Sequence, residues 1–158
     1  MKFGDVVTVV ASLAVLYVVI SFLLGTLFVS ALGYYWGMNV NAIVSILLCA
    51  VIGGVIFARK IWEEAGIQAI AKIVVLVALL MAFNVGIAAA ALPDRTAWVK
   101  QMYLDANPTA TPSAFEWYAI ESVALYSQIV LNVVLAFVLS FIGLYAGSML
   151  RKPVKSQK

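Results

Sequence analysis

The 158-residue chain is 65% hydrophobic and 11% charged, with a formal net charge of +3 and no histidine. Soluble domains are about 45–50% apolar and about 25% charged, so this composition excludes a soluble globular protein and predicts an integral membrane protein. Without histidine the chain has no His-ligated haem, His-based metal site or His general base, and its single cysteine, Cys49, cannot form an internal disulfide. We expect no cofactor and no bound metal.

Four segments are long and apolar enough for helices that cross a bilayer, which needs about 20 residues. In chain order, the expected spans cover residues 6–32, 42–60, 70–92 and 114–150. The first follows Lys2, as a cleavable signal peptide would, but its apolar run of about 27 residues is too long for a signal sequence. We therefore expect it to be a retained helix.

The break between the first two spans contains two glycines and two asparagines, from Gly33 to Asn41. Such residues favour a tight reversal, and we interpret this segment as the first loop. Further on, Arg59 precedes Glu63 and Lys60 precedes Glu64 by four residues, a spacing that stabilises a helix. The second helix should therefore continue past the bilayer and end at a bend near Gly66.

The third loop, residues 93–113, is the only sizeable segment expected outside the bilayer. Aromatic and apolar residues recur in it at helical spacing, which predicts a short interfacial helix: Trp98, Val99, Met102 and Tyr103. Asn107 and Pro108 should end this helix. Ser113 and Glu116 have the spacing of a capping box, so the last helix should begin near Ala114.

The basic residues are divided unequally between the two sides of these spans. Arg95 and Lys100 lie on one side, and eight lie on the other: Lys2, Arg59, Lys60, Lys72, Arg151, Lys152, Lys155 and Lys158. By the positive-inside rule, both termini, including the tail 151–158, should be cytoplasmic in a multi-pass protein of the cell membrane. The opposite side carries the aromatic residues of an interfacial belt: Trp36, Trp98, Trp117 and Tyr118. Residues 1–158 thus form one domain, an all-α four-helix membrane bundle.

Three amides, Asn84, Gln128 and Asn132, lie within the expected spans. Asn84 and Asn132 should share a depth, and the favoured interpretation is a hydrogen bond between helices, worth about 0.6 kcal/mol. The alternative is that the three amides line the path of an oligomeric channel or carrier for a small uncharged solute.

Small residues recur every three or four positions in the second and fourth spans. In the fourth, a stripe runs from Gln128 to Gly147; across both spans, the expected packing residues are Gly53, Gly54, Ser140, Gly143 and Gly147. Such faces let helix backbones approach closely, either inside the bundle or against another chain.

The acidic residues of the third loop and the start of the last helix, among them Asp94, Asp105 and Glu121, have no spacing that enforces acid–base catalysis. The basic residues flank apolar runs, so we expect no nucleic-acid partner. The sequence predicts a non-enzymatic accessory, scaffold or assembly subunit, whose partners are the lipid bilayer and other membrane chains or further copies of itself.

Overall fold

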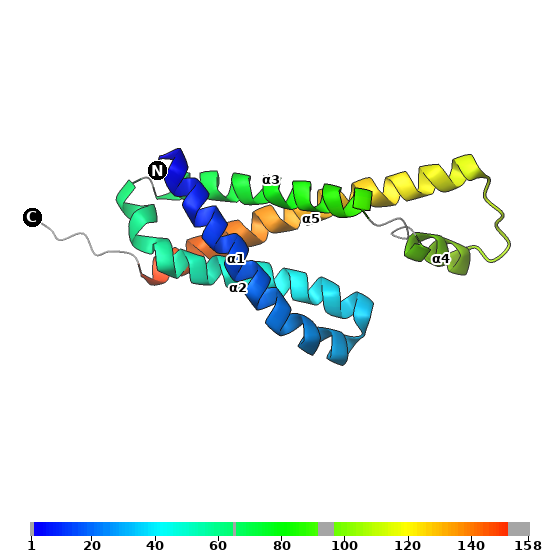
Figure 1. The fold of residues 1–158 in the computed structure, drawn as a ribbon, viewed down its shortest axis with the longest axis horizontal. Helices are drawn as coiled ribbons and strands as arrows, with labels where there is room; N and C mark the ends of the chain where they lie inside the picture. The colour runs from blue at the N-terminus through cyan, green and yellow to red at the C-terminus, as the bar shows by residue number, and fades with distance from the viewer. Residues whose placement is uncertain (1, 65, 92–96, 152–158) are drawn as a thin grey trace, which may run out of the picture. The chain divides into compact units, whose positions relative to one another are not determined.

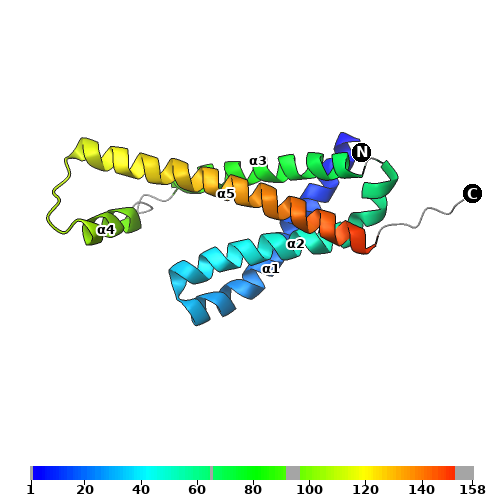
Figure 2. The same cartoon turned by 180° about the vertical axis from the view of Figure 1, so that it is seen from behind.

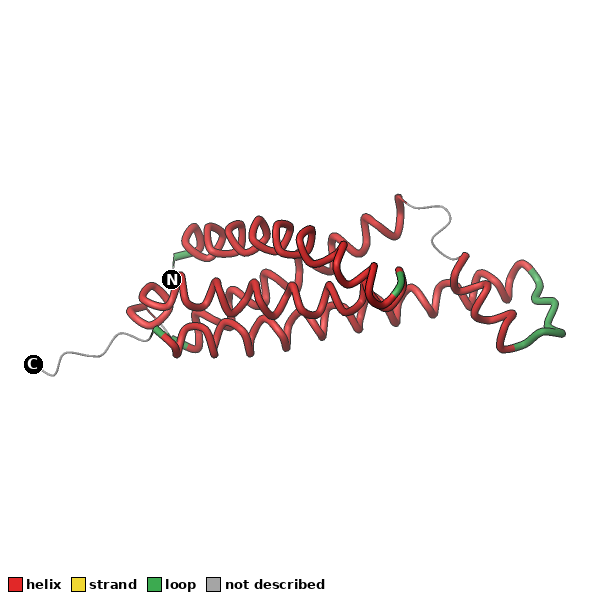
Figure 3. The backbone as a smooth tube through the Cα atoms, turned by 90° about the horizontal axis from the view of Figure 1, so that it is seen from below, coloured by secondary structure: helices red, strands yellow, loops and turns green. Residues whose placement is uncertain are grey.

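The computed structural model describes residues 2–64, 66–91 and 97–151, in which all regular secondary structure is helical (Figure 3). The helices of this part of the chain are α1 (Phe3–Leu32), α2 (Tyr34–Glu64), α3 (Ile67–Ala91), α4 (Ala97–Ala106) and α5 (Ala114–Leu150) (Figure 1). Among the described residues, three stretches are long and apolar enough to cross a membrane, namely Phe3–Leu32, Asn39–Glu63 and Ala114–Leu150, and Ile67–Phe83 is a shorter apolar stretch. The protein is thus an all-helical membrane protein, as its composition predicts.

The chain packs as two compact units. The first comprises the described residues up to Ala78 together with those from Leu135 onward, and the second is Leu79–Val134. Helices α3 and α5 each contribute to both. We describe the two units separately.

In the first unit, α1 and α2 lie side by side as a helical hairpin (Figures 1 and 2). Gly33 alone joins them, with a φ of 77° that favours glycine. The predicted loop over residues 33–41 is therefore wrong, because α2 already begins at Tyr34. At Gly37 a Cβ would lie 2.6 Å from the Phe28 carbonyl oxygen, so contact with α1 begins in the first turn of α2.

The core of the first unit joins the end of α2 to the start of α3 and the end of α5. Ile61, Ile70, Ile73, Val74 and Leu144 are fully buried there. Elsewhere large apolar side chains face outward, with Phe22 79% and Leu23 67% exposed. A helix that is apolar on all sides is stable in this state when lipid surrounds it.

Helix α2 continues to Glu64, and Arg59 Nε donates to Glu63 Oε1 at 2.7 Å. Gly66 then has a φ of 52°, and its N–H donates to the Ile61 carbonyl at 2.8 Å. Its left-handed backbone lets the chain reverse into α3, which is the expected bend.

In the second unit, the start of α5 is capped as the sequence predicts. The Ser113 N–H donates to Glu116 Oε2 at 2.7 Å, and the Glu116 N–H donates to Ser113 Oγ at 3.4 Å. Helix α4 precedes this cap, and beyond its end the Asn107 side chain donates to the Tyr103 carbonyl at 3.0 Å. The cap therefore separates two distinct helices.

Candidate functional site: the interfaces between the apolar helices

Small polar side chains line the contact between α1 and α2. The Asn41 Nδ2 donates to the Ser21 carbonyl at 3.1 Å and to Ser21 Oγ at 2.9 Å. Its Oδ1 accepts from Ser45 Oγ at 3.1 Å. One turn further, the Cys49 thiol lies 3.0 Å from the Leu13 carbonyl, to which it donates. We call these residues, Ser21, Asn41, Ser45 and Cys49, the polar seam.

The polar seam is closed to solvent on the α2 side. Asn41 is 4% exposed, Ser45 0% and Cys49 5%. A buried polar group is costly unless it is hydrogen-bonded, and here each has a partner within the seam or on α1. The seam thus holds two apolar helices together at a fixed register.

Sequence reasoning missed Asn41 as a functional residue because it placed it in a loop. The available signal was its spacing of four residues from Ser45 and of eight from Cys49, which puts all three on one face of a continuous helix. Recognising that signal requires knowing that α2 begins before Asn41.

An open groove of about 440 Å³ borders the polar seam. It is lined by Tyr17, Val18, Ser21, Phe22, Gly25, Thr26 and Asn41. A Cβ on Gly25 would lie 3.3 Å from Asn41 Nδ2, so the small residues of α1 create the hollow beside the amide. Because Ser21 and Ser45 already form hydrogen bonds with that amide, we assign the groove no binding role of its own.

The small residues of α2 and α5 bring these two helices into backbone contact. A Cβ on Gly54 would lie 2.6 Å from the Leu144 carbonyl oxygen, and one on Gly143 would lie 2.6 Å from Ala50 Cβ. A Cβ on Gly147 would collide with the Val51 carbonyl oxygen. Real side chains do not tolerate such distances, so this crossing requires glycine at these positions.

The other two expected packing residues also lie in the first unit. Gly53 faces the Leu13 side chain of α1, which a Cβ would meet directly, while Ser140 of α5 is 3% exposed. Trp62 adds a polar contact near the end of the α2–α5 crossing, because its Nε1 donates to the Ser148 carbonyl at 3.2 Å. The part of the α5 stripe from Ser140 to Gly147 is therefore occupied within the chain.

The three amides proposed as a polar pair or pore lie on α3 and α5. Asn132 is half-buried, whereas the side chains of Asn84 and Gln128 lie outside the part of the chain that the structure describes. Their contact stays a prediction.

In the second unit, aromatic and charged residues join α4 to the start of α5. The Tyr103 and Trp117 rings meet edge to face with centroids 5.5 Å apart, and Lys100 Nζ lies 2.9 Å from Glu121 Oε1. The same ammonium lies 5.7 Å from the centre of the Trp117 ring. We call these four residues the α4–α5 clasp.

The clasp contains Trp117, one of the four expected belt residues. Tyr118, the next residue, is 71% exposed. The side chains of Trp36 and Trp98 lie outside the described residues, so the belt as a whole is an expectation.

The chemistry of these sites is that of helix association. Within the described residues, no cluster of three Cys, Asp or Glu side chains is placed to hold a metal ion. The chain has no significant match among protein-family models, curated proteins or solved structures, so its function must be argued from this geometry.

Proposed function

We propose that the protein is a non-enzymatic subunit of a membrane complex, which binds a partner membrane chain through α4 and the first turns of α5. The observation that carries this proposal is that large apolar side chains are exposed beside the α4–α5 clasp. The clasp fixes α4 against α5, while Phe115 and Tyr118 beside it are 81% and 71% exposed. Large exposed apolar side chains on a rigid support are typical of binding surfaces.

The length of α5 supports a position of Phe115 and Tyr118 outside the hydrocarbon core of the bilayer. Its 37 residues extend for about 55 Å, whereas the hydrocarbon core is about 30 Å thick. Both acidic residues of this helix, Glu116 and Glu121, lie near its N-terminus, so the excess length belongs at that end. Phe115 and Tyr118 then face headgroups or water, where a protein partner can cover them.

The packing of the first unit favours α4 and the start of α5 as the partner-binding surface, rather than the glycine-containing faces of α2 and α5. Gly54, Gly143 and Gly147 are occupied by contacts between α2 and α5, so little small-residue surface remains there for another chain. The partner surface is thus assigned to the α4–α5 hairpin.

The proposal includes four membrane crossings with both termini in the cytoplasm. The 25 residues of α3 extend for about 37 Å, which is enough for a crossing. Single cysteines at Ser156 and Thr109, in a Cys49→Ala background, should react with an impermeant maleimide from opposite sides. Labelling of Ser156→Cys in intact cells would contradict the orientation.

A site-specific photo-crosslinker tests the binding surface in native membranes. Placed at Phe115, it should give one discrete protein adduct, which weakens when Tyr103→Ala opens the clasp. The matched control is the same probe at Phe22, an equally exposed position on α1, which should give lipid adducts alone. Protein adducts of equal yield from both positions, or from neither, would remove the proposal.

The channel or carrier alternative has its own test, built on the three amides. Asn84→Leu and Asn132→Leu should be folded, and a double-mutant cycle should give a coupling of about 0.5–1.5 kcal/mol if the two amides pair between helices. Solute flux in liposomes that disappears in both stable variants would replace the subunit proposal with the channel.

A further inference from the structure

Four exposed basic residues lie at helix ends of the first unit, one from each helix. They are Lys2 before α1, Arg59 near the end of α2, Lys72 near the start of α3 and Arg151 after α5. In Figures 1 and 2 these four helix ends gather at one end of the unit. We call these residues the basic belt.

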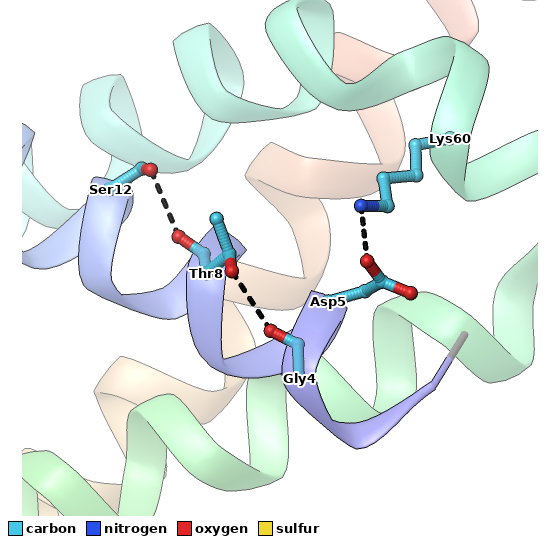
Figure 4. A network of polar contacts seen from close by, with 5 residues as sticks. All are labelled: Gly4, Asp5, Thr8, Ser12 and Lys60. Atoms are coloured by element: carbon cyan, nitrogen blue, oxygen red, sulfur yellow. Dashed lines mark hydrogen bonds and ion pairs between the residues drawn. The ribbon is translucent and has the colours of Figure 1, made fainter.

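Contacts within the unit place the basic belt at a common level. Lys60 Nζ lies 2.6 Å from Asp5 Oδ1, which sets the start of α1 beside the last turns of α2 (Figure 4). The Trp62 hydrogen bond to the Ser148 carbonyl, at 3.2 Å, sets the end of α5 at the same height. The reversal at Gly66 then returns α3 past this level, since Lys72 follows it by about two turns.

The ion pairs at this end leave the basic belt available. Asp5 is paired with Lys60 and also lies near the charge of Lys2, whereas within the described chain no ion pair joins an acidic side chain to Lys72 or Arg151. Arg59 gives only its Nε to Glu63, at 2.7 Å, and its side chain is 84% exposed. Its guanidinium charge thus remains accessible at the surface.

The net charge differs between the segments that carry the basic belt and the rest of the chain. Without the tail 152–158, five Lys and Arg residues and three Asp and Glu residues lie before Ile73 or after Leu150, so these segments carry a net charge of +2. The intervening segment, residues 73–150, carries −2. A net positive charge thus accompanies the segments that carry the basic belt.

We propose that the basic belt binds the phosphates of anionic phospholipids at the membrane surface, and that this binding stabilises the folded first unit. Basic residues at the ends of spanning helices meet the headgroup level, where each favours an anionic lipid. Bound lipid bridges cations from four helices, so it resists their separation. This inference is independent of the partner-binding proposal, because it concerns the other unit.

Thermal unfolding of the full chain in a neutral detergent tests the inference directly. Adding phosphatidylglycerol should raise the melting temperature in a saturable way, whereas phosphatidylcholine with the same acyl chains should not. The variant Arg59→Gln/Lys72→Gln/Arg151→Gln should lose about 100-fold in apparent affinity, at about fivefold for each cation.

A matched control variant distinguishes lipid binding at the basic belt from a general effect of net charge. The variant Lys152→Gln/Lys155→Gln/Lys158→Gln removes the same total charge from the tail and should keep an affinity near that of the parent. Equal losses in the two triple variants would overturn the proposal, as would equal stabilisation by phosphatidylcholine. Stabilisation by inorganic phosphate alone, at matched ionic strength, would reassign the belt to a free anion and also overturn it.

Single variants keep the test valid if the triple belt variant does not fold. Arg59→Gln and Arg151→Gln should each weaken phosphatidylglycerol binding about fivefold, with the unliganded melting temperature nearly unchanged. Arg59→Lys retains the charge and should recover most of the affinity. Folded single variants with unchanged lipid affinity would contradict the belt.

Discussion

The α2–α5 crossing of the first unit and the α4–α5 clasp of the second hold helices together by different means. In the first, glycine backbones meet, with Cβ positions at Gly54 and Gly143 only 2.6 Å from the opposing helix. In the second, long side chains bridge the helices through rings 5.5 Å apart and an ion pair of 2.9 Å.

The proposed position in the membrane accounts for this difference through the solvent around each contact. Lipid tails are as apolar as leucine, so burying leucine between spanning helices gains little, and association depends on close backbone packing and interhelical hydrogen bonds. Where water competes, aromatic burial gains free energy and charged groups can remain partly hydrated. We therefore expect substitutions that add volume to have the largest effects on stability in the α2–α5 crossing. In the clasp, we expect smaller effects, which depend on the chemistry of the side chains.

The largest effect is expected at Gly147. Replacing a helical glycine with alanine usually stabilises a helix by about 0.5–1 kcal/mol, but a Cβ here would collide with the Val51 carbonyl oxygen. Gly147→Ala should destabilise the protein by about 1–3 kcal/mol in detergent unfolding. Gly4→Ala is the control, because nothing lies within 4 Å of its Cβ position, and it should be neutral or stabilising. The same sign for both would refute the close crossing.

A smaller effect is expected at Asn41 in the polar seam. Asn41→Leu removes the bonds to Ser21 and Ser45 and should lower the free energy of unfolding by about 0.6–1.7 kcal/mol, the range for interhelical hydrogen bonds in membranes. Ser30→Ala, which removes only a bond within its own helix, is the control and should change stability less. A stability equal to the parent in Asn41→Leu would show that the seam is not a clamp.

In the clasp, the ring contact should contribute about 0.5–1.5 kcal/mol. A double-mutant cycle between Tyr103→Leu and Trp117→Leu isolates this coupling. The readout is local, such as hydrogen exchange of the α4 amides, because the first unit does not depend on these rings. Additive single effects would exclude the edge-to-face pair as a stabilising contact.

The smallest effect is expected for the ion pair of the clasp. Lys100 is 47% exposed and Glu121 25%, and such partly exposed pairs contribute about 0.2–1 kcal/mol. Lys100→Met should increase exchange of the α4 amides slightly, and 1 M salt should erase the difference, since the screening length is then about 3 Å. A salt-independent effect would contradict a contribution from the charge of Lys100.

The sequence predicts the helices of this protein better than their contacts. Apolar runs and the Ser113–Glu116 capping box indicate where helices lie, because those signals are local. The same kind of local signal predicts a loop from Gly33 to Asn41, since glycine and asparagine favour turns in isolation. The helical state of this segment depends on α1, against which Gly37 and Asn41 pack. The spacing of Asn41, Ser45 and Cys49 marks one face of a helix, but a single sequence does not show which helix packs against that face.

The one-residue link at Gly33 also has a consequence for membrane insertion. With no spacer between them, α1 and α2 cannot enter the bilayer as independent helices, and an isolated α2 would expose the Asn41 amide to hydrocarbon, where an unsatisfied polar group is costly. We therefore expect the hydrogen bonds from Asn41 to Ser21 to form while the two helices enter the bilayer together. We expect the hairpin to insert as one unit, and lengthening its link by a flexible segment should uncouple the insertion of one helix from the other.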